Sequence, residues 1–397
     1  MIIILLLLLL LTVWTSLDFI FGRRLHIKQL NVRTYPVRES YINPFTSGPK
    51  LFQDYFNELK KAEKHIHVLF YILKDDEISL EFMSILKEKA KEGVEVRLLL
   101  DWLGCLKPRR HIKKQFENTG VQLAFSRVPK FPFLFYSFNT RNHRKITVID
   151  GKVGYLGGYN VGKEYINHDK KLNPWRDYHL KIQGEGVQDL QDVFLMDWQS
   201  AAKVSIHYHD PYFPPLEKGP YRHQLIPSEG FHLEKTFTKL IRQAEQSILI
   251  GTPYFIPGKK VFSELEAALK RGVNLEILVP GTADHPLVKE ASYPYLRKLI
   301  PQGATIFQYK KGFYHAKILI IDDKVCDIGT ANFDKRSFYL NHEINCYTYD
   351  KKYIEEVLKI LKKDQKNAHV MTQKDLYPLS PWALCKEYTA RAVSLFL

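Results

Sequence analysis

Two short stretches of the chain carry the same three chemically active residue types at the same spacing. In each stretch a lysine stands two residues after a histidine, and an aspartate stands five residues after the lysine: His143, Lys145 and Asp150, then His315, Lys317 and Asp322. The residues between lysine and aspartate are apolar or β-branched, which predicts a strand. Because strand side chains alternate between faces, each histidine and its lysine share one face, about 7 Å apart.

These residue types can transfer a phosphodiester without a metal or a cofactor. A phosphodiester is anionic and its leaving alkoxide is poor, so its transfer needs cations, a nucleophile and an acid. Two lysines supply the cations. One neutral imidazole can attack phosphorus and form a phosphohistidine, while the other, protonated, donates to the leaving oxygen. A single such motif is weak evidence, whereas two copies in equivalent places make chance improbable.

Further polar residues follow each motif at similar positions. Two asparagine amides can donate hydrogen bonds to phosphate oxygens, and two carboxylates can each hold the imidazole of their own repeat in one tautomer. These residues are Asn160 and Asn332, and Asp177 and Glu343. Although Asp150 and Asp322 belong to the catalytic motif, we expect them at strand ends as structural partners of basic groups.

The elements around the motifs also occur twice. Strand-like runs are predicted at 66–73, 94–100 and 121–125, with helices between them, and the order recurs at 248–256, 273–279 and 304–309. Alternating strands and helices predict an α/β fold with a largely parallel sheet in each half, and the halves are expected to pack pseudo-symmetrically. The predicted boundaries are 49–205 for the first repeat, 206–230 for a proline-rich connection, 231–364 for the second repeat, and 365–397 for a tail with a short apolar helix from 382.

The N-terminus is expected to anchor the protein in a membrane. Residues 1–22 are almost entirely apolar and long enough to cross a bilayer, with 23–48 as a juxtamembrane linker. Basic residues follow the apolar run rather than precede it, which places the body in the cytoplasm by the positive-inside rule and disfavours a cleaved signal peptide. They are Arg23, Arg24, Lys28 and Arg33.

Charge and composition limit the partners of the protein. The net charge of +15 favours a polyanion, either an anionic membrane or nucleic acid. Four scattered cysteines indicate reduced thiols and no zinc site. The pairs His65/His67 and His207/His209 have a spacing that would suit a metal on a strand, but no cysteine or carboxylate cluster accompanies them, so we expect no metal.

The longer strings around the motifs resemble bacterial cardiolipin synthases of the phospholipase D superfamily, over roughly residues 50 to 350. They include Asn142-His-Arg-Lys-Ile-Thr-Val-Ile-Asp-Gly, Pro174-Trp-Arg-Asp, Thr252-Pro-Tyr-Phe-Ile-Pro and Gly312-Phe-Tyr-His-Ala-Lys. Many of these synthases have two N-terminal spans, so the chain is similar to a shorter form with one. The resemblance implies that phosphatidylglycerol is both donor and acceptor, that His143 is the nucleophile and that His315 transfers the proton. Its partners would be an anionic phospholipid and the membrane, not nucleic acid, and no oligomer is required because one chain holds both motifs.

Three other functions remain open from the residues. A phospholipase D hydrolase would use the same motifs with water as acceptor, a membrane-tethered nuclease would use them on another substrate, and a lipid-binding module would not use them at all. The aromatic run from Phe131 to Phe138 is equally consistent with a loop that dips into the membrane and with ordinary core.

Overall fold

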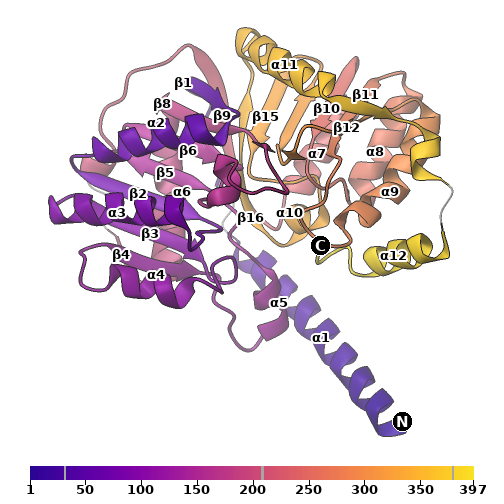
Figure 1. Cartoon of the computed structure of the whole chain (residues 1–397), viewed down its shortest axis with the longest axis horizontal. Helices are drawn as coiled ribbons and strands as arrows, with labels where there is room; N and C mark the ends of the chain where they lie inside the picture. Colours follow the sequence, from indigo (N-terminus) through magenta and orange to yellow (C-terminus); the bar gives the residue numbers. More distant parts are fainter. Residues whose placement is uncertain (31–32, 207–209, 378–379) are drawn as a thin grey trace.

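The computed structural model describes residues 1–30, 33–206, 210–377 and 380–397. In these residues two α/β halves share one continuous sheet, and the long helix α1 (Ile2–Gln29) projects away from both of them (Figure 1). The strand order of that sheet is β17-β12-β11-β10-β14-β15-β16-β9-β1-β8-β6-β5-β2-β3-β4.

The first half combines three parallel strands with a group of antiparallel ones. The parallel strands are β2 (His65–Phe70), β3 (Glu95–Asp101) and β4 (Gln122–Ser126). The antiparallel strands are β5 (Ile146–Ile149), β6 (Val153–Gly157), β8 (His179–Gly184) and β1 (Arg38–Phe45). The helices of this half are α2 (Gly48–Lys60), α3 (Glu77–Lys91), α4 (Arg109–Phe116), α5 (Leu134–Asn139) and α6 (Gly186–Ala202).

The second half repeats this plan. Its parallel strands are β10 (Ser247–Gly251), β11 (Asn274–Pro280) and β12 (Thr305–Tyr309), and its antiparallel strands are β14 (Ile318–Ile321), β15 (Val325–Gly329), β16 (His342–Thr348) and β9 (Tyr221–Glu229). Its helices are α7 (Leu233–Gln243), α8 (Lys259–Lys270), α9 (Val288–Leu299), α10 (Lys335–Tyr339) and α11 (Lys351–Lys366).

Equivalent strands from the two halves meet in the middle of the sheet. β1 lies beside β8 in the first half, β9 lies beside β16 in the second, and β1 and β9 pair antiparallel through Ser40 and Tyr221. One hydrophobic core continues across this junction, since it contains Phe194 of α6 and Val357 of α11 together with strand residues of both halves. The halves therefore form one pseudo-symmetric body, as predicted.

The expectation of a largely parallel sheet in each half is wrong. Only the runs β2-β3-β4 and β10-β11-β12 are parallel. Each motif strand instead enters a tight hairpin, in which Asp150 and Asp322 adopt φ values of 53° and 52°. So short a turn can only join antiparallel strands, whereas a parallel connection needs a long crossover.

Three predicted boundaries also need correction. Residues 23–48 are not a linker, because α1 continues to Gln29 and residues 38–45 form β1 in the sheet. The segment 206–230 is not only a connection, since its end forms the central strand β9. The tail from 365 adds β17 (Ala368–Met371) to β12 before α12 (Pro381–Ala392), which lies against α9. In β1, β9 and β17, hydrogen bonds to neighbouring strands satisfy backbone groups that have no partner within the segment itself.

The C-terminal half of α1 is docked on the aromatic segment that contains α5 (Figure 1). Asp18 accepts a hydrogen bond from the Tyr136 amide at 2.7 Å, and Phe19 contacts the rings of Phe135 and Phe396. A side chain at Gly22 would approach Tyr136 within 2.8 Å, so glycine allows this contact. Tyr136 is therefore part of the packing, whereas Phe131 keeps 76% of its surface exposed, and entry of this segment into the membrane stays a prediction.

Candidate active site

Each motif histidine is held in place by main-chain pairing with the other half of the protein. The His143 amide donates to the carbonyl of His342 at 2.9 Å, at the start of β16. The His315 amide donates to the carbonyl of Arg176 at 2.7 Å, because β13 (Phe313–Tyr314) pairs with β7 (Trp175–Arg176). These two cross-connections bring the motifs from opposite halves together.

The carboxylates that orient the imidazoles come from the opposite repeats. Glu343 contacts His143 Nδ1 with both oxygens, at 3.0 and 2.9 Å, and Asp177 contacts His315 Nδ1 at 2.6 Å. The expectation that each carboxylate serves the histidine of its own repeat is therefore wrong. Because the backbone before each histidine pairs with the other half, the Nδ1 side of the ring faces that half and its carboxylate.

Both motifs act in one electrostatic environment. The charge of Lys317 lowers the pKa of both His143 and Lys145, although burial is the larger cause in each case. Burial also lowers the pKa of Lys317, against the opposing charges of Asp177 and Glu343. Groups from the two halves are thus close enough to influence each other's protonation.

Burial sets the protonation states of the site. It lowers the pKa values of His143 and His315 to about 4 each, more than their carboxylates raise them. Burial opposes ionisation of Asp177 and Glu343 too, but the neighbouring lysine and histidine outweigh it and lower both pKa values. At neutral pH the site therefore holds neutral imidazoles and ionised carboxylates, and an incoming anionic phosphate would raise the histidine pKa values.

The two motif lysines are buried but held differently. Lys145 Nζ donates to the carbonyl of His143 at 2.8 Å and lies 5.5 Å from the centre of the Tyr71 ring, and burial lowers its pKa to about 7. Lys317 Nζ lies 2.6 Å from His315 Nδ1 and 3.5 Å from Asp177. Both ammonium groups are thus positioned beside their histidines, as a phosphate-binding pair requires.

The two asparagines have protein partners already in place. Asn160 accepts from the Ile72 amide at 3.1 Å and donates to the Tyr165 hydroxyl at 3.1 Å. Asn332 donates to Asp334 at 3.1 Å. Their contact with phosphate stays a prediction, and it would require each amide to share or exchange a partner.

Asp150 and Asp322 are structural, but their partners are backbone amides rather than basic groups. Asp150 accepts from the amides of residues 63–65, and Asp322 accepts from those of residues 245–247, at 2.7 to 2.9 Å. Each carboxylate ties its hairpin to the start of the neighbouring parallel strand. Each aspartate stands five positions after its lysine, about 17 Å along the strand, so neither aspartate belongs among the reacting groups.

Two hydroxyl groups near Glu343 complete the site and were not assigned a role from the sequence. Thr330 and Ser337 donate to its two oxygens at 2.6 and 2.9 Å. Both residues lie in the string after the second motif, Gly329-Thr-Ala-Asn-Phe-Asp-Lys-Arg-Ser. Their positions in that string were the available signal, but only the fold shows which carboxylate they contact.

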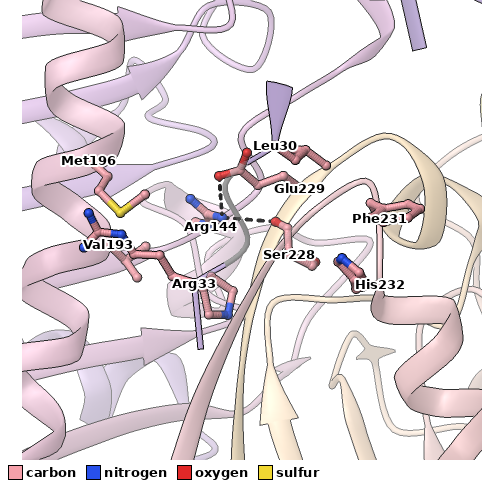
Figure 2. Close-up of a pocket in the computed structure, with 10 residues that line it drawn as sticks. Leu30, Arg33, Arg144, Val193, Met196, Ser228, Glu229, Phe231 and His232 are labelled. Carbon is pink, nitrogen blue, oxygen red and sulfur yellow. Dashed lines mark hydrogen bonds and ion pairs between the residues drawn. The ribbon is translucent and has the colours of Figure 1, made fainter. Parts of the chain in front are cut away.

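Arg144, between the first histidine and lysine, is a second residue whose role the sequence did not reveal. It is buried and pairs with Asp197 of α6 at 2.8 Å and, more loosely, with Glu229 of β9 at 3.6 Å. Figure 2 shows it beside a cavity between these elements, pointing toward Ser228 and Glu229. Arg144 thereby joins the first repeat to the strand that opens the second.

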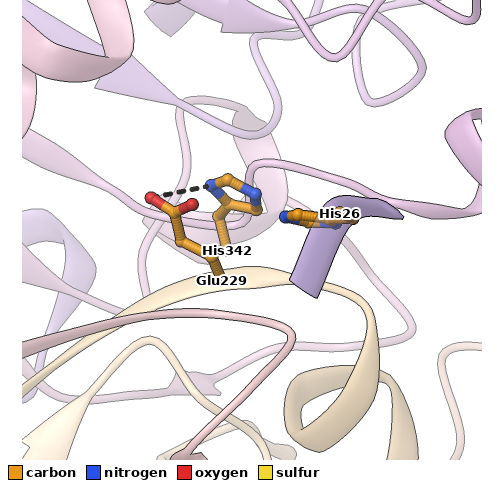
Figure 3. Close-up of side chains that lie close together, drawn as sticks. All are labelled: His26, Glu229 and His342. Carbon is orange, nitrogen blue, oxygen red and sulfur yellow. Dashed lines mark ion pairs between the residues drawn. The ribbon is translucent and has the colours of Figure 1, made fainter. Parts of the chain in front are cut away.

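One cluster of possible metal ligands lies where the anchor helix meets the body. His26, Glu229 and His342 place ligand atoms within 4.8 Å of one another (Figure 3). However, Arg127 contacts the His342 ring, and Arg144 pairs with Glu229. Two guanidinium groups at the ligand atoms fit a dication poorly, so we assign this cluster a structural role.

Among the described residues, the pair His65/His67 gives no support to a metal site. His67 is buried and contacts Glu95 at 3.2 Å and Arg97 at 3.0 Å, while its ring stacks on Phe194. The neighbouring His65 ring packs on Tyr212. Residues 207 and 209, the other pair, lie outside the described part of the chain.

Comparisons with known proteins identify the family of the chain. The family model described as "Cardiolipin synthase, PLD-like domain" matches residues 55–198 and 237–365, which contain one motif each. The chain is 39% identical over 381 residues to the minor cardiolipin synthase ClsB of Bacillus subtilis (strain 168), covering 96% of this chain and 95% of that protein. It is 36% identical over 378 residues to a cardiolipin synthase of Oceanobacillus iheyensis, covering 93% and 78% respectively.

A solved structure shares the fold. The phosphatidylserine synthase of Haemophilus influenzae Rd KW20 superimposes with a TM-score of 0.73 and 16% identity, covering 95% of this chain and all of that one. At that identity the likeness concerns the fold alone. Together with two complete motifs, the family match and the similar relatives show that this chain belongs to the cardiolipin synthase family of phospholipase D-like proteins.

Proposed function

We propose that this protein is a phosphatidyltransferase that makes cardiolipin and glycerol from two molecules of phosphatidylglycerol. The observation that carries the proposal is the crossed pair of imidazole–carboxylate contacts, His143 with Glu343 and His315 with Asp177, beside two buried lysines. This arrangement supplies a nucleophile, an acid–base group and two cations for one phosphate. The relatives named cardiolipin synthase support the choice of lipid.

In the first step, neutral His143 attacks the phosphorus of one phosphatidylglycerol. A bond forms between the imidazole nitrogen and phosphorus, and the bond from phosphorus to the headgroup glycerol breaks. Protonated His315 gives its proton to the departing glycerol oxygen, which leaves a phosphatidyl group on His143. Lys145 and Lys317, with the predicted help of Asn160 and Asn332, neutralise the non-bridging oxygens.

In the second step, the roles reverse. His315, now neutral, accepts the proton of a hydroxyl group on the headgroup of a second phosphatidylglycerol. The resulting oxygen attacks phosphorus, the bond to His143 breaks, and cardiolipin forms. Because one chain holds both motifs, one copy supplies every reacting group.

The contacts of the two rings favour His143 as the nucleophile. Lys317 Nζ lies 3.3 Å from Nε2 of His315, where the ammonium competes for the lone pair that attack on phosphorus would need. Each lysine donates to the main-chain carbonyl of its own histidine, but in the described residues Lys145 makes no hydrogen bond to the His143 ring. The ring of His143 therefore keeps a lone pair for attack, while His315 lies next to a cation that can exchange protons with it.

We also propose that α1 spans the cell membrane once and leaves the catalytic body in the cytoplasm. The helix is long and apolar enough to cross a bilayer and is largely exposed outside its docked end. Arg23, Arg24 and Lys28 follow its apolar stretch, and basic residues favour the cytoplasmic side.

The deciding experiment uses the full-length protein in vesicles that contain phosphatidylglycerol labelled in its phosphate. Labelled cardiolipin with release of glycerol is the expected result. Labelled phosphatidic acid as the main product would establish a hydrolase instead, and unchanged lipid would reject both enzymes. Cleavage of an oligonucleotide offered in parallel would favour the nuclease alternative, for which the lipid-linked relatives give no support.

A further inference from the structure

A second pocket lies outside the catalytic site, where the anchor helix meets the second repeat. Its volume is about 740 Å³, within the range of small-molecule sites. The wall combines residues along the whole of α7 with residues of α1, α8 and α10. None of the motif residues contributes to it. The lining residues are Arg23, Phe231, His232, Glu234, Lys235, Thr238, Lys239, Arg242, Lys260, Phe338 and Tyr339.

The pocket carries a strong excess of positive charge. Five lining residues are lysine or arginine, against the single carboxylate of Glu234, which accepts from the Tyr339 hydroxyl. Arg242 is paired with Glu264. Lys235 and Lys239 are exposed, four residues apart on one face of α7, and in the described part of the chain neither they nor Lys260 form an ion pair. Like charges at this spacing repel, so an anion bound between the two lysines would reduce their repulsion.

The position of the pocket identifies the source of that anion. The apolar stretch of α1 from Ile2 to Phe21 would span about 30 Å, the thickness of the hydrocarbon core. Arg23, two residues later, then lies at the level of the lipid headgroups. Its guanidinium donates to the Tyr339 carbonyl and lies 5.5 Å from the centre of the Tyr339 ring, in the pocket wall.

The pocket wall also has an apolar part that suits a lipid. Phe231 and the ring of Tyr339, both half-buried, lie among the lysines, so a bound molecule would meet both cations and aromatic surface. A phospholipid offers this combination, with an anionic phosphate above apolar chains. Nucleic acid would satisfy the charge alone, and it would have to approach a pocket that faces the bilayer.

We propose that this pocket is an accessory site for one anionic phospholipid of the leaflet that α1 enters, separate from the lipid under reaction. The lysines of α7 and α8 bind the headgroup phosphate, and the site holds the second repeat against the membrane beside the anchor. This goes beyond the proposed reaction, because the site would bind an anionic lipid that is not a substrate.

The test measures binding rather than catalysis. Full-length protein is placed in nanodiscs of phosphatidylcholine that contain a phosphatidic acid analogue with a photoreactive group near its glycerol. After illumination, labelled peptides are identified by mass spectrometry. We expect labelling of 231–243 with the phosphatidic acid analogue and at least tenfold less with the same analogue of phosphatidylcholine. Each basic residue near an anionic surface changes binding roughly fivefold, so the variant K235Q/K239Q/K260Q should lose at least tenfold of the labelling.

A matched control removes the same charge elsewhere. Lys352, Lys359 and Lys362 are exposed on α11, at the opposite end of the body from α1 (Figure 1). The variant K352Q/K359Q/K362Q should label as the wild type does, and K235R/K239R/K260R should retain the signal. Equal labelling by both lipids, an equal loss in the control variant, or displacement by an oligonucleotide would overturn the proposal. A protein that failed to make cardiolipin would not affect this result, because phosphatidic acid is not the proposed substrate.

Discussion

The two halves of the active site hold their carboxylates in place with different residues. Fifteen positions after each motif histidine, the first half has Gly158 and the second has Thr330. A side chain at Gly158 would lie 2.1 Å from the Asp177 carboxylate, whereas the Thr330 hydroxyl donates to Glu343 at 2.6 Å. The shorter carboxylate is thus packed against bare backbone, and the longer one is held by a hydroxyl.

The two motif lysines also have different partners. Lys317 shares Asp177 with His315, while Lys145 contacts only a main-chain carbonyl and an aromatic ring among its described partners. Glu343 compensates with donors from Thr330 and Ser337. The pseudo-symmetric fold therefore supplies two chemically unequal histidines, which is what a nucleophile and an acid require. Four experiments can sharpen or break this comparison.

The largest effect should come from removing either histidine. His143→Ala and His315→Ala should each lower cardiolipin formation at least about 10³-fold, since each loses a nucleophile or a proton donor. They should differ with a phosphatidyl ester of a good leaving group, which needs no acid. Mass spectrometry should then find a phosphatidyl group on His143 in the His315→Ala protein and none in the His143→Ala protein. An adduct on His315 would reverse the assignment.

The crossed carboxylates give the next effect. Glu343→Gln should reduce turnover by up to about 10⁴-fold, the size found when the carboxylate of such a pair is made neutral. With the activated ester, Glu343→Gln should block formation of the His143 adduct, and Asp177→Asn should allow the adduct but slow its transfer. The opposite pattern would mean that each carboxylate serves the histidine of its own repeat.

The unequal positions 158 and 330 should respond differently to alanine. Gly158→Ala places a carbon against Asp177 and should lower turnover by about 100-fold, whereas Thr330→Ala loses one hydrogen bond to a charged group, worth about tenfold. Thr330→Ser keeps the hydroxyl and should recover most of the rate. Initial rates at saturating lipid, with thermal unfolding as a folding control, test this. Equal losses would contradict the structural difference.

The smallest effect concerns pH. Because burial lowers the pKa of Lys145 to about 7, its ammonium is charged below that pH and loses its proton above it. The value of kcat/KM, which reports groups of the free enzyme, should therefore fall about fivefold between pH 7 and pH 8. Lys145→Arg should be less active but show no such fall, since arginine stays charged. A flat wild-type profile up to pH 9 would reject the lowered pKa.

Much of the local structure could be predicted from the sequence, for identifiable reasons. The runs at 94–100 and 273–279 are apolar and end helical segments at Gly93 and Gly272, so they formed strands β3 and β11 within a residue or two of the prediction. The repeated motif predicted two equivalent strands, β5 and β14. These features depend on side-chain periodicity and glycine conformations, which are properties of short segments.

Other features could not be predicted, because they depend on partners distant in the chain. The helix after Phe21 continues because α5 and the C-terminal residues pack against it. β9 was predicted to be part of a connection because Pro227 and the prolines before the strand hide its pattern, yet β1 and β16 on either side satisfy its backbone. The local sequence of a segment does not show which distant segments will pack against it.

The sequence by itself determined which atoms could react: two imidazoles, two ammonium groups and two carboxylates, in duplicated surroundings. The tertiary structure alone decided how they are paired, since the backbone before His143 and His315 hydrogen-bonds to the opposite half and turns each ring toward Glu343 and Asp177 respectively. Spacing along a chain fixes neighbours on one strand. Contacts between strands from different halves form only when β1 pairs with β9 and joins the two halves of the sheet.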